Sequence, residues 1–136
     1  KIRGIRAGMA VDTRAVASLV PRSLFDYYRF PSHLIDRRVA QEFAYVTGET
    51  VVAEGTANLE VQLTNGCVVT EKFYVIQGGT DILAGMPFLL KAGIQIQFTT
   101  IKGVSIYHNG APLTTLSRTP YDNIVRLHRT KGHSPW

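Results

Sequence analysis

The chain has 136 residues, of which 45% are hydrophobic and 18% are charged, so it can bury the apolar core of one domain. This composition excludes a disordered polar chain, and twelve glycines and six prolines are too few for a fibrous protein. No apolar run approaches the roughly 18 residues that a transmembrane helix needs. Residues 1–6 contain no apolar signal core and no initiator Met, so we expect a segment of a longer polypeptide.

Positive charge is concentrated at the two ends of the chain. Residues 1–6 and residues 117–136 each carry a net charge of +3, and the whole chain carries +5, so the middle has a net charge of −1. Basic ends can contact nucleic acid or acidic partners, although solvated basic tails are the more common case. We therefore expect a near-neutral body, a weak nucleic-acid contact at most, and no membrane contact.

Alternation of apolar and polar residues predicts strands along most of the chain. The predicted strands span residues 5–11, 50–54, 57–63, 67–76, 94–98 and 104–107. Asn65-Gly66 predicts a type I′ hairpin turn between the third and fourth of these strands, because both residue types tolerate positive φ. Lys102-Gly103 predicts a second turn between the last two strands.

Two short helices are predicted between the strands. Residues 87–92 begin with Pro87 in the first turn and stop at Gly93, the usual asymmetry of a helix. Residues 21–28 are the second candidate. The pattern fades after Gly110, so the sequence predicts a domain over residues 1–116 and a basic, poorly ordered extension over residues 117–136. The fold class is all-β with one or two short helices.

The chain contains one weak internal repeat. Residues 9–13 and residues 80–85 each lead from a predicted strand through a turn to a short helical stretch, about 70 residues apart. Two copies of such a unit in one small β domain suggest a pseudo-symmetric barrel.

Both repeat units resemble known motifs. Residues 11–21 resemble the active-site segment of the retropepsins, the aspartic proteases of retroviruses and gypsy-type retrotransposons. In that segment an apolar residue is followed by Asp, Thr or Ser, Gly, Ala and, three residues later, Ser. Residues 81–89 resemble the family's Asp-Ile-Leu-Leu-Gly segment before its helix, where the protease domains of DNA-damage-inducible proteins are also similar. The resemblance covers about residues 2–108 and implies a closed, homodimeric retropepsin-like barrel, the acid protease fold.

Aspartic proteolysis needs two carboxylates that share one proton around a water molecule. The chain contains Asp-Thr once, at Asp12-Thr13, so the dyad requires a homodimer with one Asp12 from each chain. The resemblance implies that Thr13 holds the two active-site loops together across the dimer. It also implies that Ala15 and Ser18 support the loop that follows the carboxylate.

The resemblance also predicts how a substrate is held. Thr47, Gly48 and Glu49, with Gly55 downstream, fall where the family has its flap. The substrate would be an extended peptide or polyprotein segment, held between the flaps and the cleft floor by strand-like hydrogen bonds.

Arg14 departs from the family pattern, which has glycine at this position. An Arg beside the dyad favours ionised carboxylates and lowers their pKa, which would leave no proton to donate. Alternatively, the guanidinium points outward and binds an acidic side chain or the substrate. Two functions follow: an aspartic endopeptidase of retroelement type, or a catalytically silent dimerisation or scaffold domain of a larger, RNA-associated protein. Retention of Asp12 and Thr13 favours the protease.

No metal or other cofactor is expected. His33, His108, His128 and His133 show no metal-ligand spacing with Cys67. No aromatic-rich strand is interleaved with Lys or Arg, which argues against an RNA-binding barrel. The single cysteine cannot form an internal disulfide and suits a reducing compartment, so we expect the cytoplasm or a virus-like particle. Cleavage preference and a viral, transposon or domesticated origin remain open.

Overall fold

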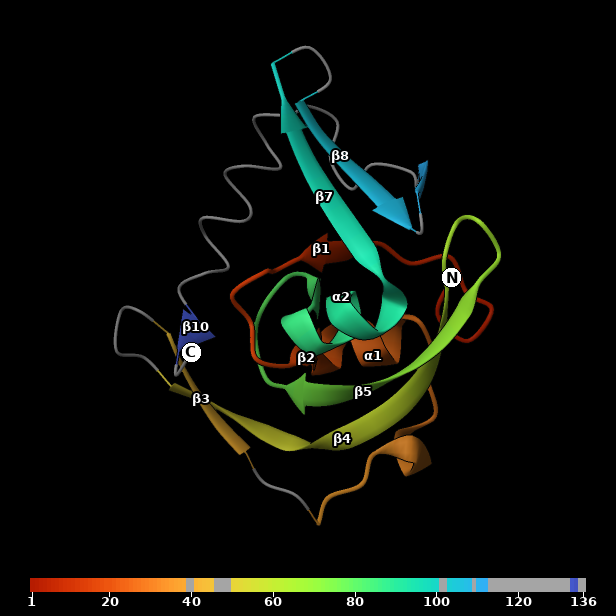
Figure 1. The fold of residues 1–136 in the computed structure, drawn as a ribbon. Coiled ribbons are helices and arrows are strands. Elements are labelled where there is room, and N and C mark those ends of the chain that lie inside the picture. Colours follow the sequence, from red (N-terminus) through yellow and green to blue (C-terminus); the bar gives the residue numbers. More distant parts are fainter. Residues whose placement is uncertain (39–40, 46–49, 101–102, 109, 113–132, 135–136) are drawn as a thin grey trace.

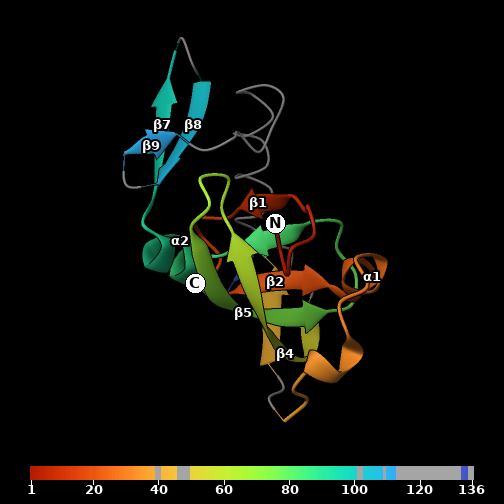
Figure 2. The ribbon, with the colours of Figure 1, turned by 90° about the vertical axis from the view of Figure 1, so that its right-hand side faces the viewer.

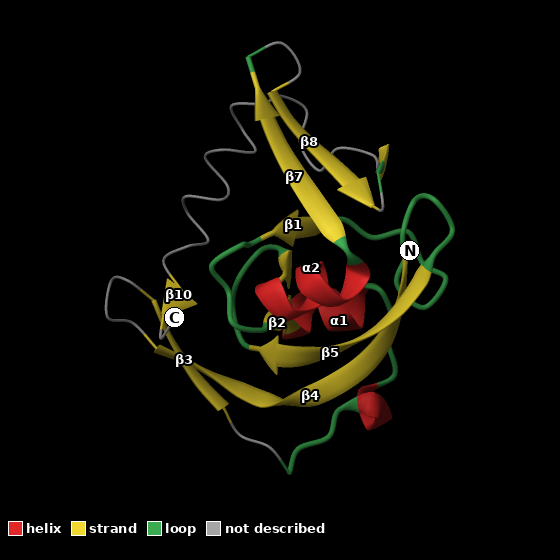
Figure 3. Ribbon diagram, viewed as in Figure 1, coloured by secondary structure: helices red, strands yellow, loops and turns green. Residues whose placement is uncertain are grey.

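The computed structural model describes residues 1–38, 41–45, 50–100, 103–108, 110–112 and 133–134. In chain order its elements are β1 (Met9–Val11), β2 (Ser18–Pro21), α1 (Arg22–Tyr27), a short 3-10 helix (Ser32–Leu34), β3 (Gln41–Tyr45), β4 (Thr50–Gln62), β5 (Val68–Ile76), β6 (Ile82–Ala84), α2 (Met86–Ala92), β7 (Ile94–Thr99), β8 (Gly103–His108), β9 (Ala111–Pro112) and β10 (His133–Ser134). The chain is therefore mostly β, as predicted, and strands dominate Figure 3.

Seven strands form one curled sheet in the order β1-β6-β2-β5-β4-β3-β10. The long antiparallel ribbon of β4 and β5 bends around the two helices, which gives the sheet the shape of a half-barrel (Figure 1). A separate three-stranded sheet, β7-β8-β9, extends away from this body (Figure 2).

Both predicted helices are present, and local signals explain their ends. The segment predicted as residues 87–92 is α2, and it stops at Gly93, whose φ of 67° is left-handed and suits glycine. The segment predicted as residues 21–28 is α1, which begins directly after Pro21. None of the helices in the described residues has the length and apolarity that a membrane crossing requires.

A strand is present at each predicted position, but two of the predictions differ clearly from the structure in their boundaries. The strands expected at residues 50–54 and 57–63 are one strand, β4, with an irregularity between Ala53 and Gly55. Gly55 lies so close to the backbone carbonyl of Asp36 that a Cβ atom would collide with it. The strand expected at residues 5–11 is shorter, because Ile5 pairs with Ile2 and regular pairing begins only at β1.

The turn at Asn65-Gly66 joins β4 and β5 as predicted, but the type I′ prediction is wrong. Of these two residues only Gly66 has a positive φ, of 93°. The Asn65 side chain is engaged instead: its Oδ1 accepts a bond from the Cys67 N–H (3.2 Å), and its Nδ2 donates to Nδ1 of His108 (2.8 Å). Among the described residues, consecutive positive φ values occur at Arg3-Gly4 (49° and 77°) and at Gly78-Gly79 (79° and 86°).

The two repeat units lie side by side in the sheet. β1 and β6 pair in parallel, with Met9 opposite Ile82 and Val11 opposite Ala84. β2 lies between β6 and β5, antiparallel to the first and parallel to the second. The ends of β1 and β6 are therefore neighbours, and the loops that follow them meet at one edge.

β2 separates two apolar clusters because it is buried on both faces. Val20 belongs to the larger cluster, which packs around the helices, and Leu19 belongs to the smaller cluster on the opposite face. Ser18 shares the face of Val20, since side chains alternate along a strand. A hydroxyl thus enters the larger core at the start of β2.

The C-terminal extension falls almost wholly outside the described residues. Residues 113–132 and 135–136 are not described, so the predicted poor order of residues 117–136 stays a prediction. The exception is β10, in which His133 lies opposite Tyr45 and Ser134 opposite Ala44.

Candidate active site

Asp12 follows β1 directly and is fully buried. Its N–H donates to the carbonyl oxygen of Ala84 (3.0 Å), which ties it to the end of β6. Its carboxylate Oδ1 accepts bonds from the N–H groups of Arg14 (3.0 Å) and Ala15 (3.1 Å). The loop therefore wraps around its own carboxylate and fixes the position of that group by backbone donors.

The loop is also fastened to the start of α2. Ala15 is buried, and its carbonyl oxygen accepts a bond from the N–H of Met86 (2.9 Å). Gly85, the residue before Met86, has an ordinary φ of −83°, but a Cβ atom there would collide with the backbone carbonyl of Ala17. Glycine is thus required by close approach of two backbones, and this approach lets the two repeat units pack at the site.

Ser18 joins this site to a buried acidic side chain. Its Oγ accepts a bond from the N–H of Gly85 (3.0 Å) and donates to Oε2 of Glu71 (2.8 Å). The other oxygen of Glu71 lies 3.1 Å from Nζ of Lys91, which also donates to the carbonyl oxygen of Thr70 (2.6 Å). Ser18 therefore connects Gly85, at the start of α2, to Glu71 on β5.

Glu71 is the member of this network that the sequence analysis missed. It is only 5% exposed and lies on the face of β5 that also carries Phe73 and Val75. An acidic residue at an inward position of an alternating strand was the available signal, because such a carboxylate is costly to bury without partners.

Thr13 and Arg14 lie at the surface of the single chain, in contrast to the buried Asp12 and Ala15. Next to them, Val16 is 42% exposed and Met86 is 40% exposed. The loop and the adjoining start of α2 therefore present both polar and apolar exposed side chains.

The predicted flap residues Thr47, Gly48 and Glu49 lie outside the described residues. The strands on either side, β3 and β4, pair in antiparallel register with Ala44 opposite Thr50.

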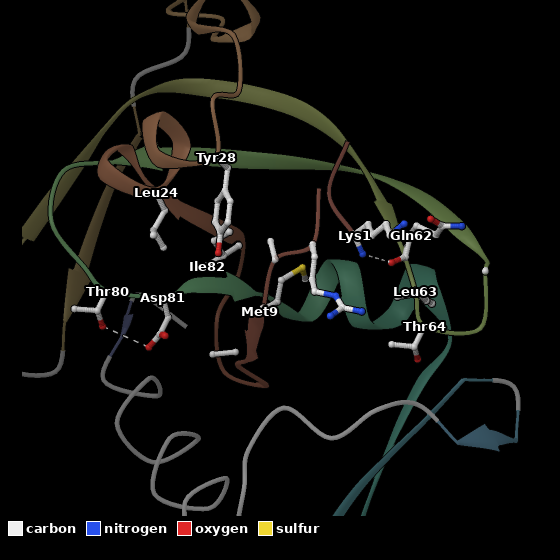
Figure 4. A pocket seen from close by; sticks show the side chains of 15 residues that line it. Lys1, Met9, Leu24, Tyr28, Gln62, Leu63, Thr64, Thr80, Asp81 and Ile82 are labelled. Atoms are coloured by element: carbon white, nitrogen blue, oxygen red, sulfur yellow. Dashed lines mark hydrogen bonds between the residues drawn. The ribbon is translucent and has the colours of Figure 1, made fainter. Parts of the chain in front are cut away.

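A cavity of about 940 Å³ lies elsewhere on the molecule. It is lined by Met9 of β1, Ile82 of β6, Leu24 of α1 and Tyr28, which directly follows α1. Asp81 lies toward one end (Figure 4). No residue from 12 to 18 lines this cavity. Among the described residues, no group of three His, Cys, Asp or Glu side chains is placed to hold a metal ion.

No protein-family model matches this sequence, and no curated protein matches it. Among solved structures, the chain is similar to the retroviral protease-like domain of Ddi1 from Leishmania major, with a TM-score of 0.65. The two are 18% identical, and the match covers 88% of this chain and 91% of that one. Likeness at this identity concerns the fold, and the fold of this chain is that of the retropepsin-like domains.

Proposed function

We propose that the chain is an aspartic endopeptidase of retroelement type, in which a dyad of two Asp12 residues, one from each chain of a homodimer, activates water. The observation that carries this proposal is Asp12 itself. It is fully buried at the end of β1, and two backbone N–H groups orient its carboxylate within a retropepsin-like fold.

The proposed chemistry follows from two carboxylates held close together. Such a pair titrates as a unit and retains one proton, because both groups cannot easily be ionised at short range. The ionised carboxylate takes a proton from the water molecule as the water oxygen attacks the carbonyl carbon of the peptide. The protonated carboxyl donates to the carbonyl oxygen, and collapse of the tetrahedral intermediate sends a proton to the leaving amine nitrogen.

A second chain is required because one chain supplies one Asp-Thr. The exposed loop residues Thr13 and Arg14, with Val16 and Met86 beside them, are the surface that we assign to the symmetric contact. Two half-barrels joined there form the closed, two-lobed molecule that the resemblance implies. An extended peptide substrate is then held between the two chains by strand-like hydrogen bonds.

The test is cleavage of a broad peptide library, followed by mass spectrometry from about pH 4 to 8. Asp12→Asn should lower cleavage by about 10³-fold or more, because it removes both the base and the acid of the dyad. The dimer should persist, since the substitution is nearly isosteric. Asp26→Asn is the matched control, because Asp26 lies on α1 and pairs with Arg22 at the surface (3.0 Å).

Transition-state mimics of the statine type should bind the wild type and not Asp12→Asn. Cleavage that persists in Asp12→Asn excludes the mechanism. A dimeric wild type that cleaves nothing in the library over this pH range excludes the protease.

A further inference from the structure

A buried hydroxyl connects two distant parts of the fold, and its hydrogen bonds have a fixed direction. The N–H of Gly85 can only donate, so Ser18 Oγ is the acceptor of that bond (3.0 Å). The single proton of the hydroxyl is then directed to Oε2 of Glu71 (2.8 Å). Glu71 therefore determines how Ser18 is oriented, and Ser18 in turn holds Gly85.

Gly85 lies between the two residues that hold the ends of the Asp12 loop. On one side Ala84 accepts the bond from the Asp12 N–H (3.0 Å), and on the other side Met86 donates to Ala15 (2.9 Å). Any displacement of Gly85 is thus transmitted to both ends of the loop. Glu71 is far from Asp12 in sequence, but only Ser18 and this short backbone segment separate them in space.

Packing alone does not explain a carboxylate at position 71. An apolar residue there would continue the face formed by Phe73 and Val75 and would avoid the cost of burying a charge. The ion pair with Lys91 (3.1 Å) offsets part of that cost, but apolar residues in place of such a pair are often neutral or stabilising, so the pair alone does not explain the carboxylate. The carboxylate also accepts a bond from the N–H of its neighbour Lys72 (3.2 Å), but that bond is local. What the carboxylate adds across the fold is a directional bond to Ser18, and a bonded buried network specifies one geometry.

We infer that Glu71 is a positioning residue of the active site: through the Ser18 hydroxyl it fixes Gly85 and so holds the loop that carries Asp12. The inference rests on the proposed function, since it names what keeps the catalytic carboxylate in place. Glu71 itself touches neither substrate nor water in this scheme, and its effect is on alignment of the dyad.

The experiment compares Glu71→Leu, which removes the acceptor, with Ser18→Ala, which removes the hydroxyl, in the full chain. Each should lower kcat by up to about 10²-fold with little change in KM, because misalignment of reacting groups affects the chemical step. The double variant should be no worse than either single one, since both break the same connection. Glu71→Gln should recover most of kcat, because its amide oxygen still accepts from Ser18.

Glu54→Leu and Glu54→Gln are the matched controls. Glu54 lies on the neighbouring strand β4 and bonds Arg22 and Arg37 (2.8 Å each), without connection to the loop. These variants should leave kcat within about twofold. Assays are run well below each melting temperature, so that a loss of stability alone does not lower kcat.

A second readout does not need catalysis. Amide hydrogen exchange of Gly85, Arg14 and Ala15 in the unliganded protein should accelerate at least tenfold in Glu71→Leu and Ser18→Ala, and not in the Glu54 variants. Unchanged exchange at Arg14 and Ala15, or an unchanged kcat in both variants, overturns the inference. If the wild type cleaves nothing, the proposed function fails, and the exchange data alone decide whether Glu71 holds the loop.

Discussion

At the scale of single residues, the burial of Asp12 bears on where the Arg14 side chain can lie. The Asp12 carboxylate accepts two backbone bonds, one of them from Arg14 itself, which offset part of its desolvation. The Arg14 backbone thus serves the loop whatever residue stands there, while its side chain lies at the exposed surface. A guanidinium at this position can therefore extend away from the buried carboxylate.

This geometry predicts the effect of restoring the family glycine. We expect the wild type to cleave peptides, and Arg14→Gly to leave kcat/KM unchanged or to lower it through loss of a substrate contact. A guanidinium directed at the dyad predicts the opposite, since it would hold both carboxylates ionised and its removal would raise activity. Peptidase assays of Arg14→Gly and the uncharged Arg14→Gln from about pH 4 to 8 separate these outcomes, and a clear rise in both variants contradicts the outward orientation.

Asp36 offers a prediction on pH. Hydrogen bonds from the Arg38 side chain (2.7 and 3.0 Å) and from the Arg38 N–H lower the pKa of Asp36 from 3.8 to about 2. Because the folded-state pKa is depressed, this pair contributes its stabilisation above pH 3.8 and loses it as the pH falls toward 2. Arg38→Gln should move the carboxyl titration, followed by NMR, back toward 3.8.

Arg37→Gln is the control for that titration, since its guanidinium bonds Glu54 (2.8 Å). It should leave the Asp36 titration in place. A wild-type Asp36 that titrates near its ordinary pKa would show that the Arg38 contact does not persist in solution.

At the scale of elements, the features that the sequence predicts correctly are those with local causes. Pro87 and Gly93 delimit α2 because one has no N–H to donate and the other adopts a left-handed φ. Gly55 misled the strand prediction because its role, close approach to Asp36, depends on a segment far away in sequence. The same reason hid Glu71, whose partners lie on β2 and α2.

The loop around Asp12 has both local features, which the sequence predicts, and distant contacts, which it does not. The motif places Asp12, Ala15 and Ser18 in one short segment, and the structure joins each to the β6–α2 connection. The direction of the Ser18 bonds was not predictable, since nothing near Ser18 in sequence identifies Gly85 and Glu71 as its partners. The local pattern thus selects candidate residues, and the fold determines what they contact.

Close packing of the two repeat units predicts a cost for any side chain at position 85. Gly85→Ala should destabilise the protein by about 1–3 kcal/mol, because the added Cβ collides with the Ala17 carbonyl and rigid backbone must move. Thermal unfolding measures the loss. Gly8→Ala is the matched control, since a Cβ atom at Gly8 has nothing within 4 Å and should leave the melting temperature almost unchanged. Equal melting temperatures for the two variants would contradict the tight approach.

At the scale of the whole molecule, the curled sheet forms a half-barrel, and the chain contains Asp-Thr once, so the proposed dyad requires a second copy. The exposed loop, with its apolar neighbours Val16 and Met86, is the surface that we propose for the contact. The basic residues at the two ends are distinct from that surface in sequence.

Sedimentation equilibrium should give twice the chain mass of 15.1 kDa. In that dimer the two-fold axis should pass between the Asp12 side chains. Val16→Glu should weaken the dimer, because two carboxylates would face each other across a contact that loses water. Val68→Glu is the control: Val68 is 56% exposed at the start of β5, so the change should leave association unaffected. Cleavage and dimer mass should fall together in Val16→Glu, since each site needs an Asp12 from both chains. A wild type that remains monomeric at high micromolar concentration, or a Val16→Glu variant that associates normally, would remove the basis for a shared dyad.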